Sequence, residues 1–423
     1  MREGRINADG TARRVVVTGS GAIAAVGKNV AEIWSAIRRG ETGIHTIERF
    51  DVSEYETRFA AEIVGFDPTV LGRKEYRRMD RFTQFAVVAT REAVQQSGLD
   101  IAAAPDRVGV LLGTGLAGIE TFESTVETLY SKGPRRVSPF AVPMTIPNMA
   151  PGMVAIDIGA KGPAFSYSSA FASSAHAIGE GARMILDGVC DAVIAGGSEA
   201  PITRIGLAGF SAMGALSTRN DDPAHAIRPF DGSRDGCVLG EGGAVLILED
   251  RDLALARGAT ILAEVVGYGT ATDAFHLVQL PENGEGLAAS MRLALDDAGL
   301  HPNQIGYLNA HGTATDMNDR VETVAIKQAF GDHAYHLPIS STKASTGHLL
   351  GAAGSLEAVI SIEAMRAGIL PPTLNQHQPD FRCDLDYIPD TARTVDVDYV
   401  MTNSMGFGGH NAVLVFANAR RAG

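Results

Sequence analysis

The sequence contains few cysteines, and their spacing excludes two kinds of structure. The three cysteines, Cys190, Cys237 and Cys383, form no CxxC pair, so we expect neither a disulfide framework nor a thiolate zinc site. Residues 1–14, MREGRINADGTARR, lack the apolar core of a signal peptide. No uninterrupted apolar run approaches the ~18 to 20 residues of a membrane span. These absences predict a soluble, cytoplasmic protein without a membrane partner.

The sequence also lacks an excess of basic residues. Its formal net charge is −13, which argues against a general nucleic-acid-binding surface. One cluster departs from this trend, because five cations recur at helical spacing, which predicts one basic helix face. They are Arg73, Lys74, Arg77, Arg78 and Arg81. From the residues alone, this face is either merely solvated or a docking surface.

The remaining composition is that of a globular protein with two domains or one large duplicated one. The chain has 423 residues, of which 45% are hydrophobic and 20% charged. Short β-branched runs alternate with helical periodicity, which indicates an α/β fold. We expect strands at residues 15–19, 108–113, 192–197 and 244–249, and helices at 80–97, 172–186 and 286–298.

Similarity between two parts of the sequence predicts a duplication. The segment SSAFASSAHAIGEGARMILDG from Ser168 is similar to SSTKASTGHLLGAAGSLEAV from Ser340, and EGGAVLILED from Glu241 is similar to GGHNAVLVFAN from Gly408. Chance similarity of turns rich in small residues is the alternative. Duplication predicts halves at residues 1–255 and 256–423, with 134–151 as a loop-and-helix excursion from the first half.

Two histidines are the main candidates for chemistry. His311 lies in NAHGTAT and His348 ends SSTKASTGH. A neutral imidazole can donate an N–H to a developing enolate oxygen without losing a proton. Either histidine alone would more often be a structural hydrogen-bonding group. A glycine-rich segment, NSMGFGGHN at residues 403–411, adds backbone that can approach a ligand closely.

Together these motifs resemble the β-ketoacyl-acyl carrier protein synthases, the elongating type II enzymes in particular, over about residues 15–416. The resemblance implies a thiolase-like α/β fold with a duplicated five-layered α-β-α-β-α core. It implies acyl transfer to a cysteine followed by decarboxylative condensation with malonyl-carrier protein, in fatty acid or polyketide synthesis. No metal or organic cofactor is implied, since phosphopantetheine arrives on the carrier protein. A homodimer is expected, and a heterodimer with a second ketosynthase-like subunit stays open.

The same resemblance assigns roles to individual residues. His311 and His348 match the paired catalytic histidines, and Lys343 is expected to order the second of them. Phe407 matches the gate of the acyl channel, although a core aromatic is the alternative. The supporting residues are the oxyanion-loop glycines Gly406 and Gly408, the substrate contacts Thr313 and Thr315, the pocket residues Leu116 and Ala141, the carboxylates Asp319, Glu322 and Glu357, and the docking cations Arg73, Lys74, Arg77 and Arg78.

The chain departs from the family at the nucleophile, where Phe171 stands in place of cysteine. A benzyl group cannot ionise, attack or form a thioester. Three interpretations remain: a synthase unable to condense, a non-catalytic subunit of the chain-length-factor type, and a malonyl-carrier protein decarboxylase. The retained histidines favour the first. We expect the ring to point into the acyl tunnel and to push Phe407 towards an open position.

Overall fold

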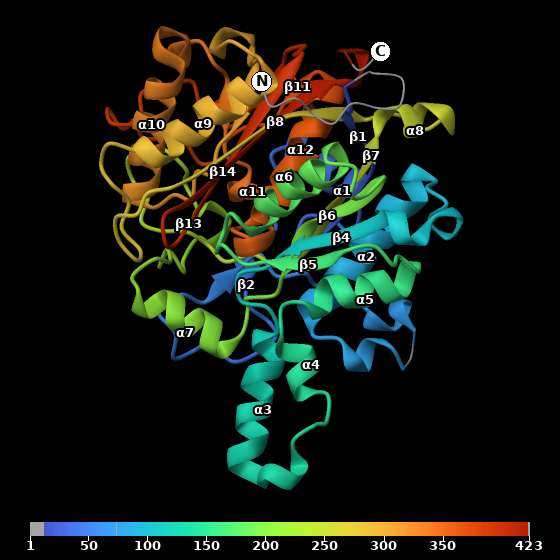
Figure 1. Ribbon diagram of the computed structural model, residues 1–423. Helices are drawn as coiled ribbons and strands as arrows, with labels where there is room; N and C mark the ends of the chain where they lie inside the picture. The colour runs from blue at the N-terminus through green and yellow to red at the C-terminus, as the bar shows by residue number, and fades with distance from the viewer. Residues whose placement is uncertain (1–11, 73, 422–423) are drawn as a thin grey trace.

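A computed structural model describes residues 12–72 and 74–421 of the chain, and a ten-stranded mixed sheet runs through it (Figure 1). The outer strands are short and the central ones long and buried. In spatial order the strands are β10 (Ile339–Ser340), β9 (Tyr307–Asn309), β13 (Tyr399–Gly406), β14 (His410–Asn418), β8 (Ala263–Thr272), β1 (Val15–Ala24), β7 (Gly242–Asp250), β6 (Ala192–Glu199), β4 (Val108–Gly113) and β5 (Ala164–Tyr167).

The same pairing pattern occurs twice in this sheet. In the first half, β1, β7 and β6 pair antiparallel, and β4 and β5 then add in parallel. In the second half, β8, β14 and β13 pair antiparallel, and β9 and β10 add in parallel. The halves join where residues 15–17 of β1 pair with β8. This repetition is what a duplication predicts, and the boundary at residues 255 and 256 stays a prediction.

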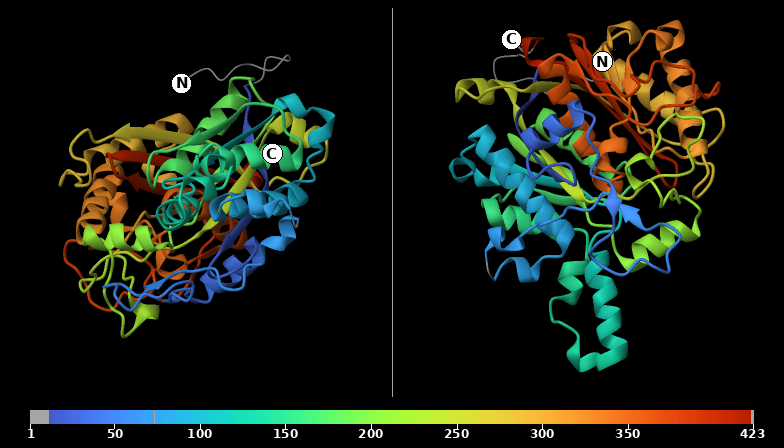
Figure 2. Two further views of the ribbon diagram at one scale, coloured as in Figure 1. Left: turned by 90° about the horizontal axis from the view of Figure 1, so that it is seen from below. Right: turned by 180° about the vertical axis from the view of Figure 1, so that it is seen from behind.

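Helices form three layers around the strands (Figures 1 and 2). On one outer face lie α2 (Arg81–Ser97) and α5 (Met149–Ile158), and on the other lie α9 (Glu285–Ala298) and α10 (Asp316–Phe330). The two halves of the sheet form the two strand layers, and α6 (Ser173–Leu186) and α12 (Ala353–Ala367) pack against each other between them, each in contact with strands of both halves. The side chains of α12 are nearly all buried. The arrangement is the five-layered α-β-α-β-α order that the family resemblance implies.

The sheet contacts explain why the middle helices are rich in small residues. A Cβ atom on Gly179 of α6 would collide with the ring of Tyr268, and one on Gly354 of α12 would lie 3.0 Å from Ala175. Only glycine permits such close approach of helix, strand and partner helix. The expected strands and the helices near residues 80–97, 172–186 and 286–298 are confirmed.

The basic cluster does not form the single helix face that its spacing predicts. Arg73 lies outside the described residues. A short 3-10 turn, Tyr76–Arg78, is followed by extended backbone at Met79, and α2 starts only after the N-cap Asp80. Arg81 turns inward to bond Glu241, with Nη2 2.6 Å from Oε1, whereas Lys74, Arg77 and Arg78 are exposed. The prediction of one basic helix face was therefore wrong.

A helical hairpin projects from the body below the sheet (Figure 1). It consists of α3 (Ile119–Lys132) and α4 (Ala141–Thr145), so the excursion starts earlier than residues 134–151. No side chain of α3 is buried. Large apolar side chains are exposed along the hairpin, namely Phe122, Leu129, Tyr130, Phe140 and Val142. Within the described part of the chain, no helix has the length and hydropathy to cross a bilayer.

The remaining elements are short or peripheral. The helices are α1 (Val30–Arg38), α7 (Arg204–Ala212), α8 (Arg251–Ala256) and α11 (Lys343–Thr346), and the small strand pairs are β2 (His45–Thr46) with β3 (Phe59–Ala60) and β11 (Ile369–Leu370) with β12 (Arg393–Thr394). Among these, α11 matters most for function, because it carries Lys343 and ends just before His348.

Candidate active site

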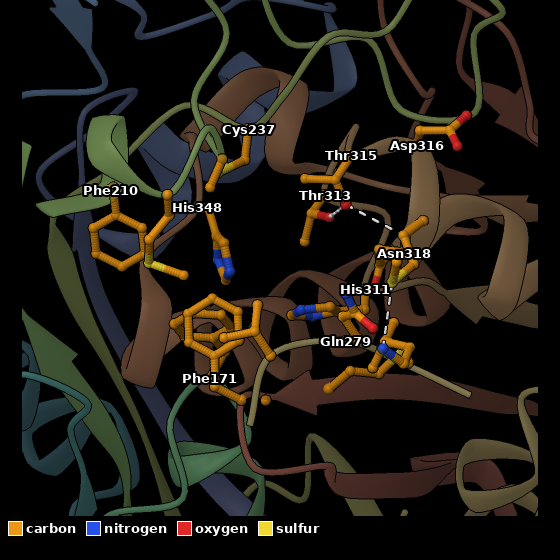
Figure 3. Close-up of a pocket in the computed structure, with 18 of the residues that line it drawn as sticks. Phe171, Phe210, Cys237, Gln279, His311, Thr313, Thr315, Asp316, Asn318 and His348 are labelled. Atoms are coloured by element: carbon orange, nitrogen blue, oxygen red, sulfur yellow. Dashed lines mark hydrogen bonds between the residues drawn. The ribbon is translucent and has the colours of Figure 1, made fainter. Parts of the chain in front are cut away.

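The loops that follow the parallel strands of both halves surround one cavity of about 350 Å³ (Figure 3). The loop after β5 brings Phe171, the loop after β9 brings His311, and the turn after α11 brings His348. The β13–β14 hairpin closes a fourth side with residues 405–407. Carboxyl ends of parallel strands lie on the same edge of a sheet, which is why segments far apart in sequence meet there.

Phe171 stands in a tight turn at the start of α6. Ala170 before it has a φ of 50°, a conformation that residues other than glycine rarely adopt. The Phe171 ring lines the cavity and packs edge to face on His348 and on Phe407, with ring centroids 4.7 Å and 4.6 Å apart. The ring therefore points into the cavity, and the identification of this cavity with an acyl tunnel stays a prediction. The expected displacement of Phe407 stays a prediction.

His348 presents an N–H donor to the cavity. The backbone N–H of Leu350 donates to its Nδ1 at 3.3 Å, so the ring hydrogen resides on Nε2. The imidazole is 2% exposed, and Nε2 has no hydrogen-bond partner among the described residues. Burial lowers the pKa of His348 well below its usual value, and the charge of Lys343 lowers it further. The ring is thus neutral, and its one free donor faces the cavity.

His311 is held in the same tautomer by a different contact. The Lys343 ammonium lies 3.4 Å from His311 Nδ1, and an ammonium can only donate. The same ammonium pairs with the Glu357 carboxylate, and all three side chains are buried. Burial, Lys343 and His348 together lower the pKa of His311. Lys343 therefore orders the first histidine, which corrects the expectation that it orders the second.

Two buried carboxylates shape the turn that carries His311. Glu322 accepts the backbone N–H groups of His311 and Gly312, each at 2.8 Å. Asp319 accepts those of Phe230 at 2.7 Å and Ala314 at 3.1 Å. Burial raises the pKa of Asp319 to about 6. Neither carboxylate is among the cavity-lining residues, so both act on the backbone of the turn.

Thr313 and Thr315 line the cavity next to His311. Their hydroxyl oxygens are 3.0 Å apart. Arg234, whose side chain is 1% exposed, holds the end of this turn by donating to the Thr315 carbonyl at 3.3 Å and to Asp316 Oδ1 at 3.1 Å. No sequence pattern pointed to this arginine, because these two partners lie about 80 residues away.

The β13–β14 hairpin reaches the turn at Phe171 because Gly406 has no side chain. A Cβ atom on Gly406 would lie 2.6 Å from the Ser169 carbonyl oxygen and 3.0 Å from the Phe171 nitrogen. Gly408, with a φ of 82°, continues the hairpin after Phe407. Gly406 and Phe407 line the cavity, and Gly408 is not among the lining residues.

The two predicted pocket residues have different positions. Leu116 packs in the apolar cluster that includes Phe171 and Phe407. Ala141 is buried in α4 of the hairpin and does not line the cavity. A residue that the sequence did not single out, Glu199, fixes the backbone near Leu116. Its carboxylate accepts N–H groups of Leu116 at 3.0 Å and Gly351 at 2.9 Å, and burial raises its pKa to about 7.

Several cavity-lining residues were missed from the sequence. They are Phe210, Met213, Gly214, Ala215, Cys237, Val278, Gln279 and Leu280. Of these residues, only Cys237 was noted in the sequence, as a cysteine without a disulfide partner. The rim at residues 278–280 and α7 reach the cavity by long-range packing, which local patterns do not encode. Within the described residues, no group of three or more His, Cys, Asp or Glu is placed to hold a metal.

Comparison with known proteins identifies the family. Residues 12–254 match the N-terminal domain of beta-ketoacyl synthase, and residues 262–377 match its C-terminal domain. The chain is 50% identical over 406 residues to 3-oxoacyl-[acyl-carrier-protein] synthase 2 of Staphylococcus aureus (strain COL), which covers 96% of this chain and 98% of that protein. The chain therefore belongs to the beta-ketoacyl synthase family.

Solved structures agree with this assignment. A beta-ketoacyl synthase from Burkholderia phymatum STM815 superposes with a TM-score of 0.89 at 38% identity, covering 96% of this chain and 99% of the other. The ketosynthase AntDE, in complex with the type II polyketide synthase acyl-carrier protein AntF, superposes with a TM-score of 0.90 at 32% identity, covering 96% and 100%. The fold is accordingly the thiolase-like fold of ketosynthases.

The neutral state of His348 predicts a pH dependence of stability. The unfolded chain protonates this histidine below about pH 6.5, whereas the buried ring stays neutral to lower pH. Stability is therefore kept above pH 6.5 and lost as pH falls, by up to about 1.4 kcal/mol per pH unit. Urea unfolding of the unsubstituted chain and of His348→Gln checks this. On acidification, the free energy of unfolding of the unsubstituted chain should fall relative to that of His348→Gln. A difference that stays constant with pH would contradict this.

Proposed function

We propose that this protein is a β-ketoacyl-acyl carrier protein synthase in a form that does not condense, because position 171 takes no part in acyl transfer. The observation that carries the proposal is the pair of neutral N–H donors, His311 Nε2 and His348 Nε2, at a cavity that the Phe171 ring also lines. The family reaction transfers an acyl group to cysteine and condenses it with malonyl-carrier protein after loss of CO₂. Replacing that cysteine with phenylalanine removes the nucleophile and leaves the two histidines that would stabilise the enolate.

The geometry of the two histidines supports this chemistry. Their ring centroids are 5.2 Å apart, so one thioester oxygen can accept from both. Loss of CO₂ from a malonyl group places an electron pair on that oxygen, and preorganised donors in a dry site stabilise it strongly. Both rings are neutral, so they donate hydrogen bonds without transferring a proton. Thr313 and Thr315 are proposed to contact the pantetheine arm beside them.

An acyl carrier protein is the proposed partner that delivers the substrate. The AntDE–AntF complex shows a structural relative bound to such a protein. On this chain, exposed Lys74, Arg77 and Arg78 give a local positive surface on a protein of net charge −13. Arg78 stacks over Phe140 at 5.1 Å, which links this surface to the helical hairpin. Such charges raise the encounter rate with an acidic partner.

A second copy of the chain is proposed to cover the edge of the sheet. The edge strand β5 exposes Phe165, and the nearby hairpin exposes Phe122 and Tyr130. Large exposed apolar groups on a sheet edge favour association. A homodimer would bury these exposed apolar side chains, and a heterodimer with a second ketosynthase-like subunit is the alternative. We place the dimer in the cytoplasm and assign it no cofactor, since the pantetheine is part of the substrate.

Restoring the thiol tests the proposal. Phe171→Cys places a thiol beside the N-terminus of α6, where the helix dipole lowers its pKa. This variant is expected to become acylated at residue 171 and to yield a β-ketoacyl product with malonyl-carrier protein. Phe171→Ala, which removes the ring without adding a thiol, is the matched control. Intact mass, peptide mapping and product analysis report the result, and no acylation at residue 171 of the Phe171→Cys variant would overturn the proposal.

A second candidate function is decarboxylation of malonyl thioesters without condensation. It is favoured by the two N–H donors, which need no thiolate to stabilise an enolate. The unsubstituted chain is expected to release CO₂ from malonyl-carrier protein, and His348→Gln is expected to slow this about 10²-fold or more. Release of ¹⁴CO₂ from labelled substrate measures both. Equal release by the two proteins would exclude His348 from the reaction.

A further inference from the structure

Cys237 lies in the same cavity, on the side opposite Phe171 (Figure 3). It is a free cysteine that is 5% exposed. Of the three cysteines, it alone lines this cavity. Cys190 packs in the core near β4 and β6, and Cys383 packs in the core of the second half. The thiol at the site is therefore distant in sequence from the position where the family carries one.

Backbone hydrogen bonds fix Cys237 between the two turns that carry the histidines. On one side, the N–H of the preceding Gly236 donates to the Ala314 carbonyl at 3.2 Å, in the His311 turn. On the other side, the N–H of His348 donates to the Val238 carbonyl at 2.7 Å. Cys237 itself donates to the Ala215 carbonyl at 2.9 Å. The thiol is thus placed by three segments and does not belong to a loose loop.

An independent feature of the cavity points to a ligand with a carbonyl oxygen. His348 Nε2 is buried and has no partner among the described residues, and a buried donor left unsatisfied is costly unless something accepts from it. Figure 3 shows the His348 ring between Cys237 and Phe171, turned towards the open part of the cavity. A thioester carbonyl seated there would accept from Nε2 while its carbon faces the thiol.

We propose that Cys237 is a covalent acceptor for acyl groups in this site. In the transfer, the Cys237 sulfur forms a bond to the thioester carbonyl carbon and the bond from that carbon to the pantetheine sulfur breaks. The Cys237 proton goes to the departing pantetheine thiolate. One thioester replaces another, so no oxidant, reductant or metal is needed. His348 Nε2–H stabilises the oxyanion of the tetrahedral intermediate. This inference rests on the proposed function only in using the same histidine.

The environment of the thiol sets how fast this transfer runs. Burial raises the pKa of Cys237 to about 12, and the nearby Lys343 charge opposes that rise. The thiolate is the nucleophile, so well below its pKa the rate should rise about tenfold per pH unit. A cysteine introduced at residue 171, at a helix start, should instead level off at lower pH. Acylation of Cys237 is therefore slow at neutral pH and steeply dependent on pH.

The test is acyl transfer from octanoyl-CoA to the unsubstituted full-length protein between about pH 7 and 9.5, a range that lies below the Cys237 pKa of about 12. Intact mass should show one octanoyl group, and peptide mapping should place it on Cys237. Cys190→Ala and Cys383→Ala should keep the adduct and Cys237→Ala should lose it. No adduct across the range, or an adduct on another residue, overturns the proposal. Mapping uses the unsubstituted chain, so it decides even if Cys237→Ala does not fold.

His348→Gln separates acyl transfer from mere thiol exposure. Acyl transfer develops an oxyanion and should slow about 10²-fold. Alkylation by iodoacetamide develops none, so its rate at Cys237 should stay within a few-fold. Equal slowing of both reactions would contradict a role for His348 in the transfer. The unsubstituted protein is also assayed for release of CO₂ from malonyl-CoA. Release of CO₂ without an octanoyl adduct would overturn only the Cys237 proposal. An adduct without release of CO₂ would overturn only the decarboxylation proposal.

Discussion

The buried ion pair between Lys343 and Glu357 is the interaction on which the site depends. Burying either charge alone would cost several kcal/mol, so each requires the other. Once paired, the ammonium lies against His311 Nδ1 and decides which ring nitrogen carries the hydrogen. The same positive charge disfavours protonation of both imidazoles. The ion pair thus sets the tautomer of His311 and helps to keep both imidazoles neutral.

The duplicated fold supplies the second constraint. Each half contributes a turn after its parallel strands, so Phe171 from one half meets His311 and His348 from the other. Glycines make this convergence possible, as at Gly406, where any side chain would collide with the Phe171 turn. Within that frame, the Phe171 ring forms one wall of the cavity, and the two histidines line the same cavity.

Much of this was predictable from the sequence because it depends on local patterns. The strands and principal helices follow from β-branched runs and helical periodicity, and the candidate site residues come from short motifs that resemble those of a known family. The prediction of one basic helix face was wrong because Asp80 caps a new helix, which the spacing of the cations alone does not reveal. Lys343 was assigned to the wrong histidine, because five residues of sequence separation say nothing about contacts across the site. Cys237, Arg234 and Glu199 were missed since their roles arise from contacts between segments far apart.

The most direct test of the account is the protonation state of the two histidines. Long-range ¹H–¹⁵N correlation spectra of protein labelled at histidine nitrogen distinguish the two neutral tautomers from the imidazolium, with His311→Asn and His348→Asn assigning the signals. Both rings are expected to be neutral and to carry hydrogen on Nε2 at pH 7, and to remain so on acidification to about pH 5.5, a unit below the usual histidine pKa. An imidazolium signal, or hydrogen on Nδ1 of either ring at pH 7, would contradict it.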